Sequence, residues 1–418
     1  SSAIHSGASM NPVLFADDPQ FWFETLRTMG HATYGGADIA EVLTTAQNIV
    51  AGDYDAWHHE WLATADRIAA EAETQLAAGH RVSARDGLLR ANNYYRAAEF
   101  FLHGDPTDPR IHHAYHRARQ CFQTAAALSI PAIEIVEIPY EDTILHGYFY
   151  RAAGSEGDDT PRPTMVLHNG FDGPAEEMHH CGGAAGVERG YHVLTFDGPG
   201  QGAARHFEGL VFRSDWENVV TPVLDWVMAR PEVDQFRVGL LGLSMGGLLA
   251  PRAAAFDHRL AACVAVDGIY ELGATVLSHF PGSRADVEVA LRADRAPEVD
   301  AAMENLMASD PTVRWAITNG MYVMGVDSPR AFAACYLDYT LAGGIAEQIS
   351  CPTLVCDGEA DMFWAGQPQE LFDHLNCPKT LLRFTDAEGA GAHSQFGAQR
   401  LAYARIYDWL DDTLTISD

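Results

Sequence analysis

The sequence predicts an α/β fold: a mostly parallel, doubly wound sheet behind an N-terminal helical domain, with a helical lid inserted late in the sheet. Up to about residue 130 the apolar residues recur at helical spacing. After Pro131, short apolar runs bounded by glycines alternate with helical segments, until a mostly helical stretch between Val266 and Thr353 interrupts the alternation. Continuous apolar strands that alternate with helices are typical of a parallel sheet covered on both faces.

The helical domain is expected over residues 18–130. Residues 1–17 are expected to form a flexible tail, in part a remnant of cloning. Four segments of the domain show the 3.6-residue period of amphipathic helices: 39–49, 54–77, 82–102 and 109–128. Since each such helix has an apolar face to bury, we expect them to pack against one another.

The catalytic domain is expected over residues 131–418, with the lid at about 270–348. Residues 133–138 and 145–150 alternate like an antiparallel hairpin. Six apolar runs predict the further strands: 164–167, 192–196, 237–243, 262–266, 353–355 and 380–384. Five segments predict helices between or after them: 175–189, 215–229, 245–256, 369–375 and 397–413. Because the lid follows the sixth strand, it should lie over the carboxyl edge of the sheet, where ligands bind in such folds.

Composition excludes several classes of function. The chain has 418 residues, and 27 Lys and Arg against 57 Asp and Glu give a formal charge of −30. A nucleic-acid partner is excluded, because a phosphate backbone requires clustered basic residues. No apolar run has the length of a membrane span, so no membrane partner is expected. The seven cysteines include no Cys-x-x-Cys pair, which favours free thiols over disulfides or a zinc site. Since free thiols persist in a reducing compartment, we expect a cytoplasmic protein.

The strongest local motif is Gly242-Leu243-Ser244-Met245-Gly246, which follows an apolar strand and opens a helix. A nucleophilic serine in a G-x-S-x-G motif occupies a strained strand-to-helix turn that requires small neighbours. Its hydroxyl projects above the sheet, and the N–H of the next residue, here Met245, points at the developing oxyanion. Ser244 is therefore the candidate nucleophile, with a purely structural glycine turn as the alternative.

A serine nucleophile needs a base, and the base needs an acid that orients it. In α/β-hydrolases these residues follow the serine in the order acid, histidine. A glycine-rich loop ahead of the last helix contains the candidate base, His393. The loop after the seventh strand contains the candidate acid, Asp361. Asp357, Glu359 and Asp267 are the alternatives for that role.

The oxyanion hole requires a second backbone donor from the loop after the third strand. That loop, residues 168–173, reads H-N-G-F-D-G, and we expect the N–H of Phe171 to be the donor. Asp172 is unexpected here, because a carboxylate beside an oxyanion hole repels the charge that forms there. From the chemistry alone, two interpretations of Asp172 are equally good: a residue that caps the loop, or a functional residue.

These motifs resemble one branch of the α/β-hydrolases. The resemblance is carried by H-N-G-F-D-G, G-L-S-M-G-G, D-G-E-A-D and A-H-S-Q-F-G, behind the helical segment A-R-D-G-L-L-R-A-N-N-Y-Y-R-A-A-E-F. The branch includes dihydroxypseudooxynicotine hydrolase, the polyketide-shortening hydrolases of fungal pigment synthesis and the FrsA-type esterases. Since dihydroxypseudooxynicotine hydrolase has a catalytic Glu in the oxyanion loop, the resemblance implies that Asp172 belongs to the catalytic set.

The resemblance implies a serine hydrolase without a cofactor that cleaves a carbon–carbon bond next to a carbonyl, in a 1,3-diketone-like, aromatic or polyketide-type ketone. The alternatives are a carboxylesterase or lactonase, an acyltransferase or cyclase of secondary metabolism, and a non-catalytic hydrolase-like binding module. The partner is then a small-molecule ketone or ester. The relatives also suggest a homodimer through the helical region, and the oligomeric state stays open.

The substrate pocket should lie between the helical domain, the lid and Ser244. Four aromatic residues are candidates for substrate binding, with helix packing as the alternative: Tyr94, Tyr95, Tyr322 and Trp364. Two histidine pairs, at 112–113 and 179–180, could suggest a metal. Adjacent residues on a helix point in different directions and no further ligand set follows, so we expect no metal.

Overall fold

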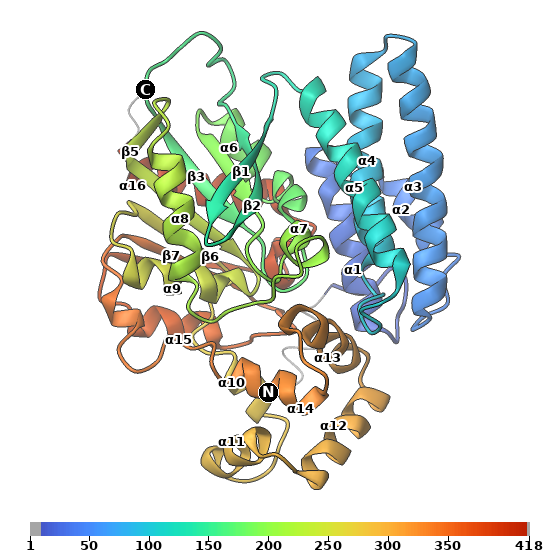
Figure 1. Ribbon diagram of the computed structural model, residues 1–418, viewed down its shortest axis with the longest axis vertical. Helices are drawn as coiled ribbons and strands as arrows, with labels where there is room; N and C mark the ends of the chain where they lie inside the picture. The colour runs from blue at the N-terminus through green and yellow to red at the C-terminus, as the bar shows by residue number, and fades with distance from the viewer. Residues whose placement is uncertain (1–9, 416–418) are drawn as a thin grey trace.

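The computed structural model describes residues 10–415, and these contain an eight-stranded sheet (Figure 1). The strands, in chain order, are β1 (Glu134–Tyr140), β2 (Thr143–Tyr150), β3 (Arg162–His168), β4 (His192–Phe196), β5 (Val233–Leu243), β6 (Ala262–Val266), β7 (Thr353–Gly358) and β8 (Lys379–Phe384). Their spatial order is β1-β2-β4-β3-β5-β6-β7-β8. Strand β2 runs antiparallel to β1 and β4, and all other pairs are parallel, which confirms the predicted sheet and its hairpin.

Helices cover both faces of the sheet, so most residues of its central strands are buried. All residues of β4 and β6 are buried, whereas the edge strand β1 alternates between buried and exposed residues. One face is covered by α8 (Glu217–Met228), α9 (Gly246–Phe256) and α15 (Gln367–His374), the other by α6 (Gly183–Glu188) and α16 (Gln399–Thr413). This is the doubly wound arrangement that the alternation of strands and helices predicts.

The prediction of one helix over 175–189 was wrong. The structure has a short 3₁₀ helix, η3 (Ala175–His179), and then α6, separated by residues 180–182. Gly182 precedes α6 with φ 108°, a left-handed conformation that glycine adopts readily and that a continuous right-handed helix cannot contain. A short helix that was not predicted, α7 (Gly202–His206), follows β4.

The N-terminal helices form a layer beside the sheet, on the right of Figure 1. They are α1 (Pro19–Gly30), η2 (His31–Tyr34), α2 (Ile39–Ala46), α3 (Tyr54–Ala77), α4 (Arg81–Glu99) and α5 (Pro109–Leu128). Helix α4 packs between α3 and α5, and the buried Trp57 and Trp61 of α3 contribute to the core. Of the expected tail, residues 1–9 lie outside the described residues, and Phe15 packs edge-on against Phe21.

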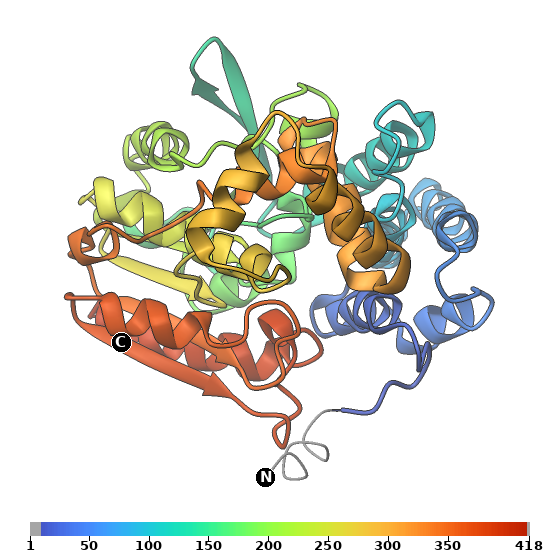
Figure 2. The same cartoon turned by 90° about the horizontal axis from the view of Figure 1, so that it is seen from below.

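The insertion between β6 and β7 consists mainly of helices gathered at one end of the sheet, below it in Figure 1 and toward the viewer in Figure 2. They are α10 (Gly273–Leu277), α11 (Arg284–Arg292), α12 (Pro297–Ser309), α13 (Pro311–Met324), α14 (Pro329–Tyr336) and η4 (Ala346–Gln348). Helix α13 also contacts α1, so the insertion and the N-terminal layer meet next to the carboxyl ends of the strands. None of the helices described combines the length and apolarity that a bilayer span requires.

Candidate active site

Ser244 occupies the turn between β5 and α9, with a φ of 62°. A left-handed conformation is costly for a residue with a side chain, so the surrounding structure must hold it in place. Gly242 allows the turn to be this tight, because a Cβ at that position would lie 2.0 Å from the carbonyl oxygen of Gly246. The sequence motif therefore forms the strained strand-to-helix turn that a nucleophilic serine requires.

Ser244, His393 and Asp361 form a continuous series of hydrogen bonds. The hydroxyl of Ser244 lies 2.8 Å from Nε2 of His393, whose Nδ1 lies 2.8 Å from Oδ2 of Asp361. His393 belongs to the short helix η5 (His393–Gln395) after β8, and Asp361 lies on the loop after β7. All three side chains are buried, although their positions in the chain are far apart.

The carboxylate of Asp361 is well held. Its Oδ1 accepts hydrogen bonds from the backbone N–H groups of Phe363 and Trp364, at 2.8 and 3.2 Å. Burial by itself raises the pKa of Asp361, but the charge of His393 and the hydrogen bonds outweigh burial and lower the pKa to about 2. Asp361 is therefore an anion at neutral pH, as a residue that orients an imidazole must be.

The alternative acids have other partners. Asp357 lies 3.8 Å from Nε of Arg383, and Glu359 accepts a hydrogen bond from the backbone of Asp386. Asp267 is buried beside Asp361 and accepts a hydrogen bond of 2.8 Å from Gln395. Burial and the charge of Asp361 raise the pKa of Asp267, which favours its neutral form.

The expected oxyanion donors lie close to each other. A Cβ on Gly170 would lie 2.6 Å from the backbone nitrogen of Met245, so only glycine lets the loop after β3 come this near to Ser244. Within residues 10–415 the N–H groups of Phe171 and Met245 donate no hydrogen bond to the protein. Two free backbone donors beside a nucleophile can hold an oxyanion, each contributing about 3–4 kcal/mol to the transition state.

A cavity of about 420 Å³ opens above Ser244 and His393. It lies between α1, the oxyanion loop and the helices of the insertion, as the sequence predicts for the substrate pocket. Most of its lining is apolar, including Phe23, Phe171, Val276, Trp315, Phe332 and Trp364. The ring of Trp364 stands edge-on to that of His393, with 4.8 Å between centroids, so the expected place of Trp364 at the pocket agrees with the structure.

The other three expected substrate-binding residues lie away from this cavity. Tyr94 and Tyr95 are buried between the N-terminal helices, where their hydroxyls donate hydrogen bonds to Glu41 and Asp66. Tyr322 is buried beneath α13, and its hydroxyl lies 2.6 Å from Nδ1 of His206. These predictions were wrong because an amphipathic pattern shows which residues are buried, but not whether they face a neighbouring helix or a cavity.

Asp172 faces the cavity but is not free. Its carboxylate lies 3.0 Å from the guanidinium of Arg27, a residue of α1 that also lines the cavity. Arg27 has a second carboxylate partner, Glu177 on η3, and a third neighbour, Glu24, at 3.1 Å. Asp172 is therefore held by a buried cation from the N-terminal layer. Its main partner is not the backbone of its own loop, as the loop-capping interpretation would require.

The buried cluster around Arg27 is close to neutral. Glu177 lies 2.7 Å from His31 and 3.4 Å from Arg96, and the attraction of the two arginines outweighs burial and keeps its pKa well below the usual range. Burial raises the pKa of Glu24 to about 8, so this carboxyl is mostly neutral at pH 7. The charges of Arg27 and Arg96 then balance those of Glu177 and Asp172. Buried charges are tolerated in a protein interior when they are paired in this way.

Sequence reasoning missed this cluster. The available signal was a polar stripe among the buried residues of α4, where Asn93, Arg96 and Glu99 are spaced three residues apart. Asn93 accepts hydrogen bonds from Arg96 and donates to two backbone carbonyls, so the stripe helps to hold the cluster. Arg27 itself lacked a signal, because a single arginine in an amphipathic helix usually faces solvent.

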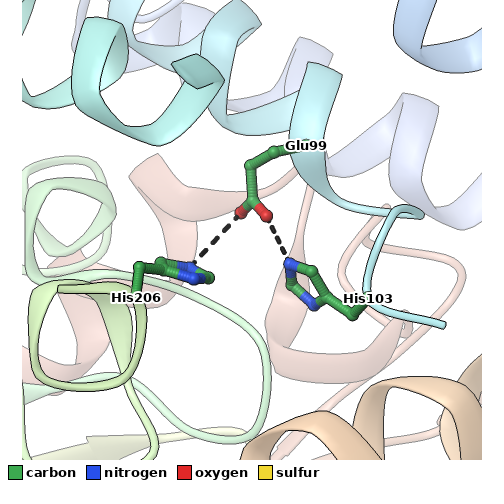
Figure 3. A group of neighbouring side chains, drawn as sticks. All are labelled: Glu99, His103 and His206. Carbon is green, nitrogen blue, oxygen red and sulfur yellow. Dashed lines mark hydrogen bonds and ion pairs between the residues drawn. The ribbon is translucent and has the colours of Figure 1, made fainter. Parts of the chain in front are cut away.

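Two clusters among the described residues contain three side chains of the types that bind metals. They are Asp267, Asp361 and His393, and a second group of Glu99, His103 and His206 (Figure 3). In each cluster a histidine nitrogen and a carboxylate oxygen are in direct hydrogen-bond contact. Two ligands of one zinc ion are further apart, about 3.3 Å for metal–ligand distances near 2.0 Å, so both arrangements fit hydrogen bonds better than an ion.

The model of the family described as Esterase FrsA-like matches residues 14–288. The chain belongs to this family. As an FrsA-like α/β-hydrolase it is an enzyme of the hydrolase class, in agreement with the prediction. It is 34% identical to Hydrolase acrC of Aspergillus aculeatus, over 95% of this chain and 97% of the relative. It is also 34% identical to 20-hydroxy-prefusarin hydrolase FUS2 of Gibberella moniliformis, over 96% and 98% of the two chains.

The fold of this FrsA-like hydrolase is similar to a solved structure. The crystal structure of the 2,6-dihydroxy-pseudo-oxynicotine hydrolase matches 92% of this chain and 95% of that chain, with a TM-score of 0.68 and 23% sequence identity. This likeness confirms the α/β-hydrolase fold together with its N-terminal helical region. The relatives that carry the family assignment span almost the same length as this chain.

Proposed function

We propose that this FrsA-like hydrolase cleaves a carbon–carbon bond next to a carbonyl in a 1,3-diketone-like, aromatic or polyketide-type ketone, through an acyl-serine at Ser244. One observation carries the proposal: the hydrogen-bonded series Ser244–His393–Asp361 lies at an apolar cavity whose wall also holds the carboxylate of Asp172. A relative that is named a hydrolase of 20-hydroxy-prefusarin supports a small organic substrate.

The reaction begins when the Ser244 oxygen attacks the substrate carbonyl and Nε2 of His393 takes the hydroxyl proton. Asp361 accepts the hydrogen bond from Nδ1–H and stabilises the imidazolium that forms. The carbonyl oxygen becomes an oxyanion between the N–H groups of Phe171 and Met245. Since these donors are already in place, little reorganisation accompanies the charge development.

Collapse of the tetrahedral intermediate breaks the bond between the carbonyl carbon and its α-carbon. The bonding electrons move into the enolate of the second carbonyl, and His393 returns its proton to the α-carbon, which releases a ketone. Water, deprotonated by His393, then hydrolyses the acyl-serine to a carboxylic acid. The carboxylate of Asp172 accepts a hydrogen bond from this water or from the O–H of an enol, and Arg27 holds that carboxylate at 3.0 Å.

Ester hydrolysis is the second candidate, and the family description as esterases favours it. Attack, oxyanion binding and deacylation are the same, but the leaving group is an alkoxide. An alkoxide needs only a proton from His393, whereas an enolate also needs its oxygen positioned. Carbon–carbon cleavage should therefore depend on Asp172 more strongly than ester hydrolysis does.

Product analysis with a 1-aryl-1,3-diketone and its ester analogue tests the proposal. We expect the wild type to release the aryl carboxylic acid and a methyl ketone from the diketone, Ser244→Ala to release neither, and Asp172→Asn to lose diketone cleavage more than ester cleavage. The exposed Asp338 provides a matched control, Asp338→Asn, with both activities unchanged. Ester cleavage without diketone cleavage by the wild type, or equal losses for Asp172→Asn, would contradict the carbon–carbon assignment.

A further inference from the structure

Outside the Ser244 site, Glu99, His103 and His206 form a group that connects the end of α4 with α7, and the first two of them are buried (Figure 3). Glu99 ends α4, His103 lies four residues further on, and His206 ends α7. Both imidazole rings point a nitrogen at the carboxylate: Nε2 of His103 is in direct contact with one oxygen, and Nε2 of His206 lies 3.9 Å from the other. None of these groups has a part in the mechanism above.

The far side of each ring leads to helix α13 of the insertion. Nδ1 of His103 lies 2.7 Å from Oδ1 of Asn319, and Nδ1 of His206 lies 2.6 Å from the hydroxyl of Tyr322. Asn319 is 1% exposed, and its Nδ2 donates a hydrogen bond of 3.1 Å to the carbonyl oxygen of Phe171. A hydrogen-bonded chain therefore runs from the N-terminal layer through the insertion to the oxyanion loop.

The direction of every hydrogen bond in this chain is determined. The carbonyl of Phe171 can only accept, so Asn319 must present its amide nitrogen to Phe171 and its oxygen to His103. His103 must then donate from Nδ1, and it also donates from Nε2 to the carboxylate of Glu99, so it is an imidazolium. Burial by itself lowers the pKa of His103, but the charge of Glu99 and the hydrogen bonds to Glu99 and Asn319 outweigh burial and raise it. Burial lowers the pKa of His206 to about 4, which leaves Glu99 and His103 as a balanced pair.

The attachment point of this chain is functionally sensitive. Phe171 supplies one expected oxyanion donor through its N–H, and Asp172 follows it directly. The ring of Phe171 packs against Trp315, Phe332 and Tyr336, with centroid separations of 5.7, 5.9 and 5.8 Å. The carbonyl of Phe171 belongs to the peptide unit that Phe171 shares with Asp172, and the Asn319 amide donates the hydrogen bond that holds this unit. Together with the packing of the ring, this contact restrains the Cα of Phe171, which also carries the N–H expected to bind the oxyanion.

We propose that Asn319, oriented by the Glu99–His103 pair, is a positioning residue that holds Phe171 so that its N–H faces the oxyanion at Ser244. This inference rests on the proposed serine mechanism. It also assigns a purpose to the insertion beyond closing the cavity, because α13 supplies a contact that holds the oxyanion loop. Helix α13 lines the cavity with residues such as Trp315, and Asn319, one turn further on, reaches the carbonyl of Phe171.

Asn319→Asp and Asn319→Leu test the inference. Asn319→Asp keeps the acceptor for His103 but loses the donor to Phe171, and Asn319→Leu loses both. Removal of an entire oxyanion donor costs about 10²–10³ in kcat, so its misplacement should cost about 10- to 100-fold, with KM for p-nitrophenyl acetate within about threefold. Glu99→Gln leaves His103 without its charged partner. Its kcat should lie between those of the Asn319 variants and that of the wild type. The matched control is Thr318→Val on the same helix, whose hydroxyl bonds only within α13.

A transition-state mimic separates positioning from a general loss of structure. An aryl trifluoromethyl ketone forms an oxyanion adduct with the serine, so its Ki should rise by the same factor as kcat falls, while the melting temperature of Asn319→Asp stays near that of Thr318→Val. If kcat and Ki of both Asn319 variants lie within twofold of the wild type, the inference is overturned. Stoichiometric zinc in the purified protein, lost in His103→Asn, would also overturn it. A wild type that neither hydrolyses esters nor binds the ketone refutes the serine mechanism itself, an outcome visible before any variant is made.

Discussion

Two buried polar regions meet at the cavity, and they are built in different ways. At the sheet edge, Ser244, Asp361 and His393 lie on loops that follow parallel strands, and each is joined to the next by one hydrogen bond of 2.8 Å. On the side of the N-terminal layer, Arg27 binds several carboxylates at once, within a charge-balanced cluster. In the first region a proton moves between Ser244 and His393 while Asp361 stays ionised. The second region is a network that holds separate segments together.

Substitutions in the two regions should therefore change different measured quantities. A change in the linear series leaves the surrounding packing intact and should alter the rate of reaction. A change in the network leaves buried charges without partners and should alter the free energy of unfolding.

Ser244→Ala should give the largest effect, a loss of about 10⁶ in kcat, because the covalent step disappears. The melting temperature should hardly change, since the hydroxyl bonds only to His393. Hydrolysis of p-nitrophenyl acetate and thermal unfolding measure the two quantities. Ser309→Ala, an exposed serine at the end of α12, is the control with wild-type activity. Residual activity within tenfold of the wild type would place the nucleophile elsewhere.

Asp361→Asn should lower kcat by about 10⁴, because the amide no longer stabilises the imidazolium and favours the wrong tautomer of His393. The structure should remain folded, as the backbone N–H groups of Phe363 and Trp364 can still donate to the amide oxygen. The same ester assay gives the rate, and Asp267→Asn is the informative comparison. If Asp267→Asn lost more activity than Asp361→Asn, the acid would be wrongly assigned.

Arg27→Met should lower the free energy of unfolding by about 3–5 kcal/mol, because Glu177 and Asp172 lose a buried partner. Urea unfolding measures the loss. Arg292→Met removes an exposed arginine from Asp338, at 3.0 Å, and should cost at most about 1 kcal/mol. Equal losses for the two variants would show that the Arg27 cluster stabilises the fold no more than a surface pair.

Glu24→Gln should change how the free energy of unfolding depends on pH. Because the pKa of Glu24 is raised to about 8 in the folded protein, its contribution is fully present below its unfolded pKa and is lost as the pH rises toward 8. The stability of the wild type relative to Glu24→Gln should therefore fall between pH 5 and 8, by at most about 1.4 kcal/mol per pH unit. Urea titrations at several pH values test this, with the exposed Glu73→Gln as the control. A constant difference over that range would contradict the neutral state of Glu24.

Most of the fold and the linear part of the site could be predicted from local patterns. A few neighbouring residues are enough to predict the conformation of each of these features: the strands of continuous apolar residues, the G-x-S-x-G turn and the glycine-rich loop before His393. The position of Asp361 could be narrowed to four carboxylates but not decided, because loop residues two or four apart can all point toward one histidine. Only the distance of 2.8 Å to Nδ1 distinguishes it.

The remaining features depend on contacts between distant segments. Tyr94, Tyr95 and Tyr322 have the aromatic character of a substrate pocket, but they pack between helices. Arg27 and Asn319 have no motif, yet they contact Asp172 and Phe171 of the oxyanion loop. Periodicity reports the burial of a side chain and says nothing of which other segment covers it.

The amino-acid order by itself determined the sheet, the strained turn at Ser244 and the identity of the base, because those features follow from backbone preferences and short-range spacing. The tertiary structure alone decided which carboxylate faces the imidazole, which aromatic rings reach the cavity and how α1 and α13 hold the oxyanion loop. Those outcomes depend on where the N-terminal layer, the sheet and the insertion come together, and that placement is set by the packing of their surfaces rather than by any one segment.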